Sequence, residues 1–157
     1  MPTDNPGLFQ SEVEQLFHHL SRAHHLMLTT LQREIEGLGV DGKLQPGMRP
    51  LICTLVEEDG LSVSDLAKRL NMAKSSVTGA VKRMASAGVV DLVPDDSDLR
   101  IRRVQLTAEG RALKPLCLQI DEVISKRLGT VFSETELSQL RELLARLISV
   151  MGNRDDS

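Results

Sequence analysis

Residues 62–88 read SVSDLAKRLNMAKSSVTGAVKRMASAG, and this stretch predicts two short helices joined by a tight turn. Ser62 is placed to cap the first helix, and Asp65 follows at the position where a carboxylate favours the positive end of a helix. The second helix is expected from Lys74 to Ala87, with Gly88 ending it in a left-handed conformation. The pattern predicts a helix-turn-helix around which the other elements are arranged.

The second helix has an apolar side and a polar side. Its inward positions recur at helical spacing: Val77, Ala80, Val81 and Met84. The residues left outside are short polar or basic ones: Lys74, Ser75, Ser76, Thr78, Lys82 and Arg83. A DNA major groove admits one helix, and short hydrogen-bonding side chains and Arg or Lys read its base edges. These six residues are therefore candidate DNA contacts, and a solvated helix surface is the alternative.

A β-hairpin is predicted directly after this helix. The apolar runs 89–93 and 101–106 are separated by the turn-rich patch 94–98. We expect Leu61 to begin a short strand beside this hairpin. A hairpin after a helix-turn-helix is the wing of a winged helix, and basic residues lie at or just past its tip: Arg100, Arg102 and Arg103. A narrow minor groove attracts such arginines; the alternative is that they pair with the neighbouring aspartates.

Residues from about 50 to 115 resemble the MarR family of bacterial winged-helix transcription regulators. The matching positions are Leu66-Ala67, Leu70, Ser76-Val77-Thr78, Val81, Gly88-Val89-Val90, Asp98-Leu99-Arg100, Leu106-Thr107 and Gly110. The resemblance implies that Ser75, Ser76 and Thr78 contact the major groove, that Arg100 enters the minor groove and that Asp98 shapes the wing. It also implies a ligand cleft between the dimerisation helices and the DNA-binding region.

Two positions depart from the family pattern. The family usually has a second arginine between the aspartate and the arginine of the wing, where this chain has Leu99. A polar cap is common before the second helix, where this chain has Ala73, and an alanine cap forfeits about 1 kcal/mol relative to serine. Neither departure removes the predicted fold, but Leu99 alters the expected wing contacts.

Composition narrows the function classes. The 157 residues are 41% hydrophobic, and the 2% that are aromatic are all Phe, so base stacking of the kind used on single-stranded RNA is not expected. No apolar run approaches the roughly 20 residues of a membrane span, no secretory signal opens the chain, and we expect a cytoplasmic protein. The net charge is −3, yet residues 68–103 carry +4 and the rest carries −7. A basic window on an acidic body favours phosphate binding.

Helices are expected on both sides of the winged helix. Their predicted ranges are 9–36, 50–58, 107–128 with a kink at Pro115, and a last helix after Ser133, which forms a capping box with Glu136. Residues 37–47 are expected to form a loop. The terminal helices carry apolar stripes wider than one small core can cover, which favours a homodimer over a helical monomer. We therefore assign residues 46–106 to DNA binding and residues 1–45 and 107–157 to a helical dimerisation region.

Catalytic and metal-dependent chemistry is not indicated. Four histidines lie in the first helix without the spacing of a metal site: His18, His19, His24 and His25. Cys53 and Cys117 lie on apolar helix faces and are expected to be buried small residues rather than sensors. We expect no cofactor, no metal and no enzyme activity, and no membrane partner. The prediction is a mainly α, winged helix-turn-helix homodimer that binds a palindrome in double-stranded DNA as a ligand-responsive repressor. The alternative is a winged-helix protein-interaction module.

Overall fold

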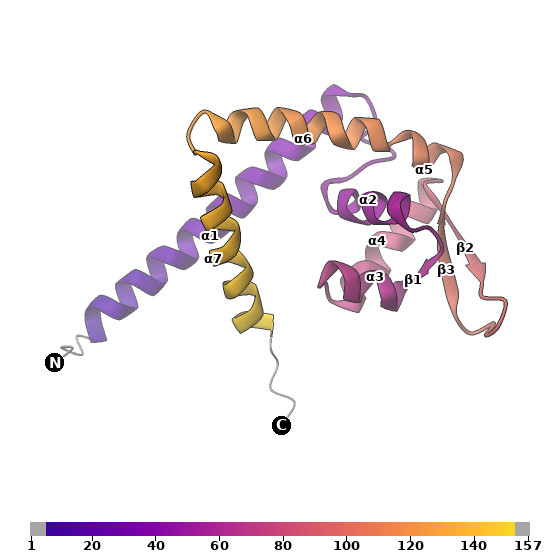
Figure 1. Ribbon diagram of the computed structural model, residues 1–157, viewed down its shortest axis with the longest axis horizontal. Coiled ribbons are helices and arrows are strands. Elements are labelled where there is room, and N and C mark those ends of the chain that lie inside the picture. Colours follow the sequence, from indigo (N-terminus) through magenta and orange to yellow (C-terminus); the bar gives the residue numbers. More distant parts are fainter. Residues whose placement is uncertain (1–5, 153–157) are drawn as a thin grey trace. The chain divides into compact units, whose positions relative to one another are not determined.

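The computed structural model describes the backbone of residues 6–152 and the side chains of residues 11–152. Expectations for the chain ends and for the side chain of Phe9 lie outside these residues. The elements are α1 (Pro6–Gly37), the 3-10 helix η1 (Pro46–Met48), α2 (Arg49–Glu57), β1 (Leu61–Ser62), α3 (Val63–Leu70), α4 (Lys74–Ser86), β2 (Val90–Pro94), β3 (Arg102–Leu106), α5 (Ala108–Ala112), α6 (Lys114–Gly129) and α7 (Glu134–Gly152) (Figure 1). The fold is mainly helical with a small antiparallel sheet, as predicted.

The chain divides into two compact units, which are described separately. Unit 1 comprises Met1–Cys117 and unit 2 comprises Leu118–Ser157, so the boundary falls inside α6. Unit 1 contains the helix-turn-helix and the sheet.

The helix-turn-helix forms for the local reasons expected from its sequence. The Ser62 hydroxyl accepts from the Asp65 amide at 3.1 Å and donates to the Asp65 carboxylate at 2.7 Å. The hydrogen bond that the Ser62 hydroxyl donates is the main reason why the pKa of Asp65 lies below its ordinary value. Asn71 ends α3 with a φ of 50°, and Gly88 follows α4 with a φ of 73°. Both are in the left-handed region, which Asn tolerates and Gly adopts at no steric cost.

The sheet has the strand order β1–β3–β2 and contains the predicted hairpin. β2 pairs with β3 from Val90 opposite Leu106 to Pro94 opposite Arg102. The expected strand at Leu61 is present as β1, which pairs Leu61 with Val104. Because β1 continues directly into α3, this pairing ties the wing to the first helix of the helix-turn-helix.

The core of unit 1 is aliphatic, as expected from a composition poor in aromatic residues. Most of the fully buried side chains come from α2, α3, α4, the sheet and the residue before β2, and they include Leu51, Ile52, Leu55, Leu66, Val77, Val81, Met84, Val89 and Val104. Ile35 of α1, Leu44 of the following loop and Met48 of η1 also belong to this core. In α4 the buried residues are the predicted inward positions at steps of three and four residues. Such packing fixes the rotation of α4 and therefore which of its residues face outward.

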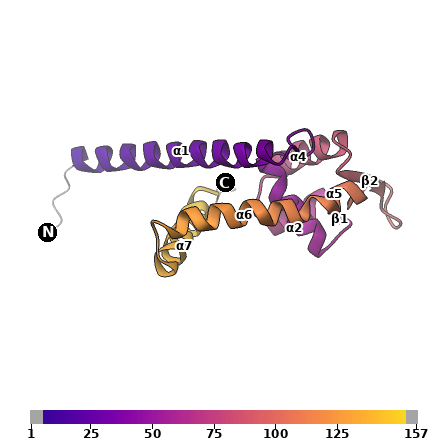
Figure 2. The ribbon, with the colours of Figure 1, turned by 90° about the horizontal axis from the view of Figure 1, so that it is seen from above.

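Helix α1 is one uninterrupted helix, as Figure 2 shows. Leu31 and Ile35 near its C-terminal end are buried, but the apolar residues between 11 and 30 are not. Phe17 is 55% exposed and Met27 is 54% exposed. The predicted apolar stripe is therefore present but only partly covered within one chain.

Two expectations about element boundaries were wrong. The loop expected over residues 37–47 ends in the short helix η1, which begins at Pro46 because proline fits the first turn of a helix. The single helix expected over residues 107–128 is two helices, α5 and α6, separated at Leu113. Pro115 lies in the first turn of α6 rather than in a kinked helix interior, since its missing N–H costs nothing there.

Unit 2 shows the predicted capping box. The Ser133 amide donates to the Glu136 carboxylate at 2.8 Å, and the Glu136 amide donates to the Ser133 hydroxyl at 3.3 Å. The Ser133 amide is the largest cause that lowers the pKa of Glu136. Helix α7 follows with no buried side chain. Among the described residues, no helix is long and apolar enough to cross a membrane.

Candidate nucleic-acid interface

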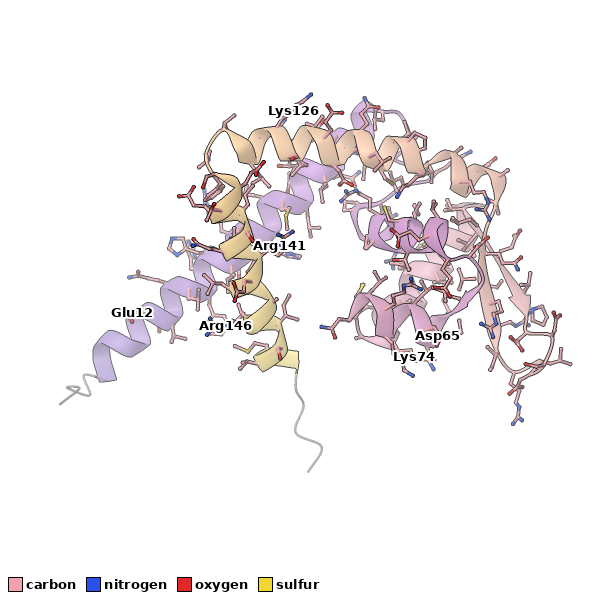
Figure 3. All side chains as sticks on the ribbon, viewed as in Figure 1. Glu12, Asp65, Lys74, Lys126, Arg141 and Arg146 are labelled. Atoms are coloured by element: carbon pink, nitrogen blue, oxygen red, sulfur yellow. The ribbon has the colours of Figure 1, made fainter. Side chains whose placement is uncertain are left out.

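The six predicted residues of α4 form a continuous polar surface, called here the outer face of α4: Lys74, Ser75, Ser76, Thr78, Lys82 and Arg83. All are exposed except Thr78, which is half-buried. Lys74 lies at the edge of the helix-turn-helix (Figure 3). The buried side of α4 is apolar, so its opposite side presents three cationic and three hydroxyl side chains.

The start of α4 is open to an anion. Ala73 occupies the cap position with extended backbone and provides no side-chain hydrogen bond. Its carbonyl accepts from the amides of Ser76 and Val77, at 3.0 and 3.1 Å. The first-turn amides of a helix carry partial positive charge and bind phosphate when no side chain caps them. The cap missing at Ala73 therefore costs helix stability but leaves this helix start accessible.

One hydroxyl is already engaged. The Thr78 hydroxyl donates to the Lys74 carbonyl at 2.8 Å, one turn earlier in the helix. Its proton is therefore used within α4, and its oxygen can accept from an exocyclic amino group of a base. Ser75 and Ser76 remain the better candidates for donating a hydrogen bond outward.

The loop of the wing is organised by Asp95, a residue that the sequence analysis did not single out. Its carboxylate is buried and accepts from the Ser97 amide at 2.8 Å, the Ser97 hydroxyl at 2.5 Å and the Asp98 amide at 3.0 Å. The other oxygen accepts from Nε of Arg103 at 2.5 Å. These bonds, those of Ser97 above all, hold the pKa of Asp95 well below its ordinary value. Asp95 is therefore a carboxylate at neutral pH.

The arginines of the wing divide into two roles. Arg103 pairs with Asp95 and also donates to the Gly60 carbonyl at 3.3 Å, so it holds the wing against the residue before β1. For Arg103, therefore, the alternative of pairing with a neighbouring aspartate is the one observed. The Arg100 side chain is 93% exposed. Its backbone amide donates to Asp98 at 3.0 Å, and its Nε lies 3.3 Å from the same oxygen. Arg102 is exposed on β3. Arg100 and Arg102 are thus available to a partner.

A local signal could have identified Asp95. An aspartate two residues before a serine in a turn-rich patch favours an Asx-turn, in which the carboxylate accepts from the amide two residues on. The pairing of Arg103 with Gly60 had no such signal, because the two residues are 43 positions apart.

The base of the wing is locked to the helix that follows it. The Thr107 hydroxyl donates to the Gly88 carbonyl at 2.7 Å and accepts from the Gly110 amide at 3.1 Å, so Thr107 caps α5. The Thr107 amide donates to the Val89 carbonyl at 3.1 Å. A Cβ on Gly110 would lie 2.1 Å from that carbonyl oxygen, so only glycine allows this approach. The connection from α4 to the wing is therefore fixed on both sides.

Other titratable groups form no second site within the described residues. No group of three or more metal-binding side chains is found among them. Both cysteines are free, and burial raises the pKa of the Cys117 thiol. His19 bonds within its own helix, its Nδ1 donating to the Gln15 carbonyl at 2.6 Å. His25 lines a hollow of about 690 Å³ beside η1, together with Leu28, Gln32, Arg33 and Gln45.

Comparisons with known proteins agree with this geometry. A sequence model of the MarR family matches residues 54–101. The transcriptional regulator AdcR of Streptococcus pneumoniae is 36% identical over 100 residues, which are 62% of this chain and 68% of AdcR. The transcriptional activatory protein BadR of Rhodopseudomonas palustris is 28% identical over 152 residues, which are 96% of this chain and 85% of BadR.

The fold is also similar to a solved structure. BpsR of Bordetella bronchiseptica, whose DNA binding is regulated by 6-hydroxynicotinic acid, matches with a TM-score of 0.69 and 25% identity. The match covers 85% of this chain and 98% of that chain. The winged helix, the open outer face of α4 and the matches to transcription regulators lead to one conclusion: this chain belongs to the MarR family and is a transcription regulator of that type, not an enzyme.

Proposed function

We propose that the chain works as a homodimer that binds a palindromic operator, with α4 in the major groove and the wing in the minor groove. The observation that carries this proposal is that unit 1 exposes both the basic outer face of α4 and the Arg100 side chain, which is 93% exposed. A major groove accommodates one helix, and a narrow minor groove attracts arginine.

Residue roles follow from this docking. Ser75, Ser76 and Thr78 contact base edges or phosphates near the start of α4, while Lys74, Lys82 and Arg83 contact phosphates. Arg100 and Arg102 contact the minor groove and its walls, and Asp98 holds Arg100 by accepting from its backbone amide. Arg103 and Asp95 position the wing rather than contacting DNA.

The dimer is proposed from apolar side chains that one chain leaves uncovered. In α7 they include Leu140, Leu143, Ile148 and Met151, which are 42–64% exposed. In α1 they include Leu16, Phe17 and Met27, which are 51–55% exposed. Exposed apolar stripes of this kind mark interfaces. We infer that residues 1–45 and 107–157 form the dimer and residues 46–106 bind DNA, with the two DNA-binding regions about one helical turn, roughly 34–36 Å, apart.

Ligand control is proposed at the hollow beside η1. Its lining combines Leu28 and Pro46 with the polar Gln32, Arg33 and His25, which suits a small organic acid. BpsR, which has a similar fold, is regulated by such an acid. An acid bound to both α1 and η1 would change the DNA affinity by favouring one position of α1 over another. We expect the effector to release DNA, which makes the protein a repressor that responds to its ligand.

The first experiment is a fluorescence-anisotropy titration of the protein against fragments of its own promoter region at two salt concentrations. Salt-sensitive binding that prefers one palindromic fragment supports the proposal. Binding that is equal on all fragments, or absent, contradicts it and favours a winged helix used for protein contacts. Addition of 6-hydroxynicotinate tests ligand control, with Arg33→Ala as the variant that should lose any response.

The dimer has a separate test by light scattering after size-exclusion chromatography. Leu143→Glu places a charge among the exposed apolar side chains of α7 and should give a monomer. Ser138→Glu adds the same charge on the polar side of α7 and should remain dimeric. A Leu143→Glu protein that stays dimeric at micromolar concentration would show that α7 does not form the interface.

A further inference from the structure

Gly79 lies in the middle of the outer face of α4 and has no side chain to offer there. It is the sixth of the thirteen residues of α4, with Ser75 one turn before it and Arg83 one turn after it. The residue is partly exposed and the helix continues through it without a break. A glycine at this position is unfavourable for the helix, because only proline has a lower helix propensity.

Nothing inside the protein requires glycine at this position. Its φ is not in the left-handed region, unlike the φ of Gly88. A Cβ built on Gly79 would meet one neighbour within 4 Å, the Nη1 atom of Arg83 at 3.4 Å. That atom is the end of a flexible, exposed side chain, which can move at little cost. Gly110 differs, since its Cβ would overlap a backbone carbonyl.

We propose that Gly79 sets how deeply α4 enters the major groove, by letting the DNA approach the helix backbone where any other residue would hold it away. This inference rests on the proposed function, in which the outer face of α4 contacts DNA. Glycine is the residue that permits close approach of a backbone to a ligand. The short side chains of Ser75 and Thr78 reach base edges only if the helix axis lies close to them.

The proposal requires stability and affinity to change in opposite directions. Gly79→Ala should raise the melting temperature by about 2–4 °C, because alanine is the better helix former. The same substitution should weaken operator binding by about 10-fold, since one added methyl group separates α4 from the groove. Leucine has a helix propensity close to that of alanine but a larger side chain, so Gly79→Leu should weaken operator binding further.

The matched control is Gly37→Ala. Gly37 is exposed at the end of α1, its φ is not in the left-handed region, and a Cβ there would meet nothing within 4 Å. This variant should bind the operator with wild-type affinity. Unchanged operator affinity in Gly79→Ala, alongside the higher melting temperature, would overturn the proposal.

Arg83 provides the second discriminating measurement. If the space above Gly79 serves the Arg83 guanidinium rather than DNA, then Gly79→Ala should have no effect once Arg83 is alanine. Direct approach of DNA predicts that the 10-fold loss persists in the Arg83→Ala background, and its disappearance there would overturn the proposal. A wild-type protein that fails to prefer any promoter fragment would instead refute the proposed function, so the two failures are distinguishable.

Discussion

Gly110→Ala tests the packing that holds the wing in place. Gly110 is buried in α5, where a Cβ would lie 2.1 Å from the Val89 carbonyl oxygen and 3.0 Å from Cδ2 of Leu106. Real Cβ atoms do not approach another atom within 3.0 Å, so α5 and the backbone at Val89 must separate by about 1 Å.

The expected loss can be worked from the contacts that this separation breaks. Thr107 donates through its amide to the Val89 carbonyl at 3.1 Å and through its hydroxyl to the Gly88 carbonyl at 2.7 Å. A movement of about 1 Å takes these donors beyond hydrogen-bond range, at about 0.5–1.5 kcal/mol each. Overpacking adds about 1–3 kcal/mol. We therefore expect the free energy of unfolding to fall by about 2–6 kcal/mol, a large share of the roughly 5–15 kcal/mol of a typical domain.

The assay is urea denaturation followed by far-UV circular dichroism, at one protein concentration because dimerisation would stabilise the folded state. Gly37→Ala is again the control, since its Cβ would contact nothing and the free energy of unfolding should hardly change. A Gly110→Ala loss below about 1 kcal/mol would refute the reasoning, because it would mean that α5 can shift away from Val89 without disturbing the wing.

Three other predictions concern the wing and the cysteines. Asp95→Asn should weaken operator binding and lower the free energy of unfolding. Because folding lowers the pKa of Asp95, its carboxylate stabilises the fold fully above the ordinary pKa of about 3.9, and this stabilisation is lost as the pH falls below that value. The stabilities of the variant and the wild type should therefore converge in acid, and a difference that stays constant with pH would contradict this. Arg100→Ala should reduce the salt dependence of operator binding by about one ion while the dimer persists; an unchanged slope would show that Arg100 does not contact phosphate or groove. Cys117 should react with a thiol reagent in a Cys53→Ser variant only as urea unfolds the protein, because burial raises its thiol pKa; rapid labelling of the folded protein would refute its burial.

Much of the DNA-binding region was predictable because its signals are local. Capping by Ser62, the left-handed turn at Gly88, the inward face of α4 and the hairpin each depend on residues within one turn or one strand of each other. The same holds for the capping box at Ser133. Six candidate contacts on α4 followed from one helical period, and the structure leaves all six on one face.

The missed features depend on residues far apart in the chain. Arg103 was grouped with Arg100 as a basic residue near the tip of the wing, but it bonds to Gly60, 43 residues earlier. The break between α5 and α6 was missed because the apolar stripe continues through it, and helical periodicity does not report where a helix restarts. Pro115 was expected to kink a helix and instead lies in the first turn of one.

Sequence alone determined the class of fold and the chemistry of the exposed α4 surface, since helical period, caps and turn residues act over a few positions. Only the tertiary structure decided that Arg103 is the wing arginine held by Asp95 and Gly60, and why Gly110 must be glycine. The Asp95 carboxylate is buried beside Arg103, and the backbones at Gly110 and Val89 come into contact, only after segments distant in the sequence have packed together. That packing also distinguishes Gly110, which the fold requires, from Gly79, for which the fold has no use.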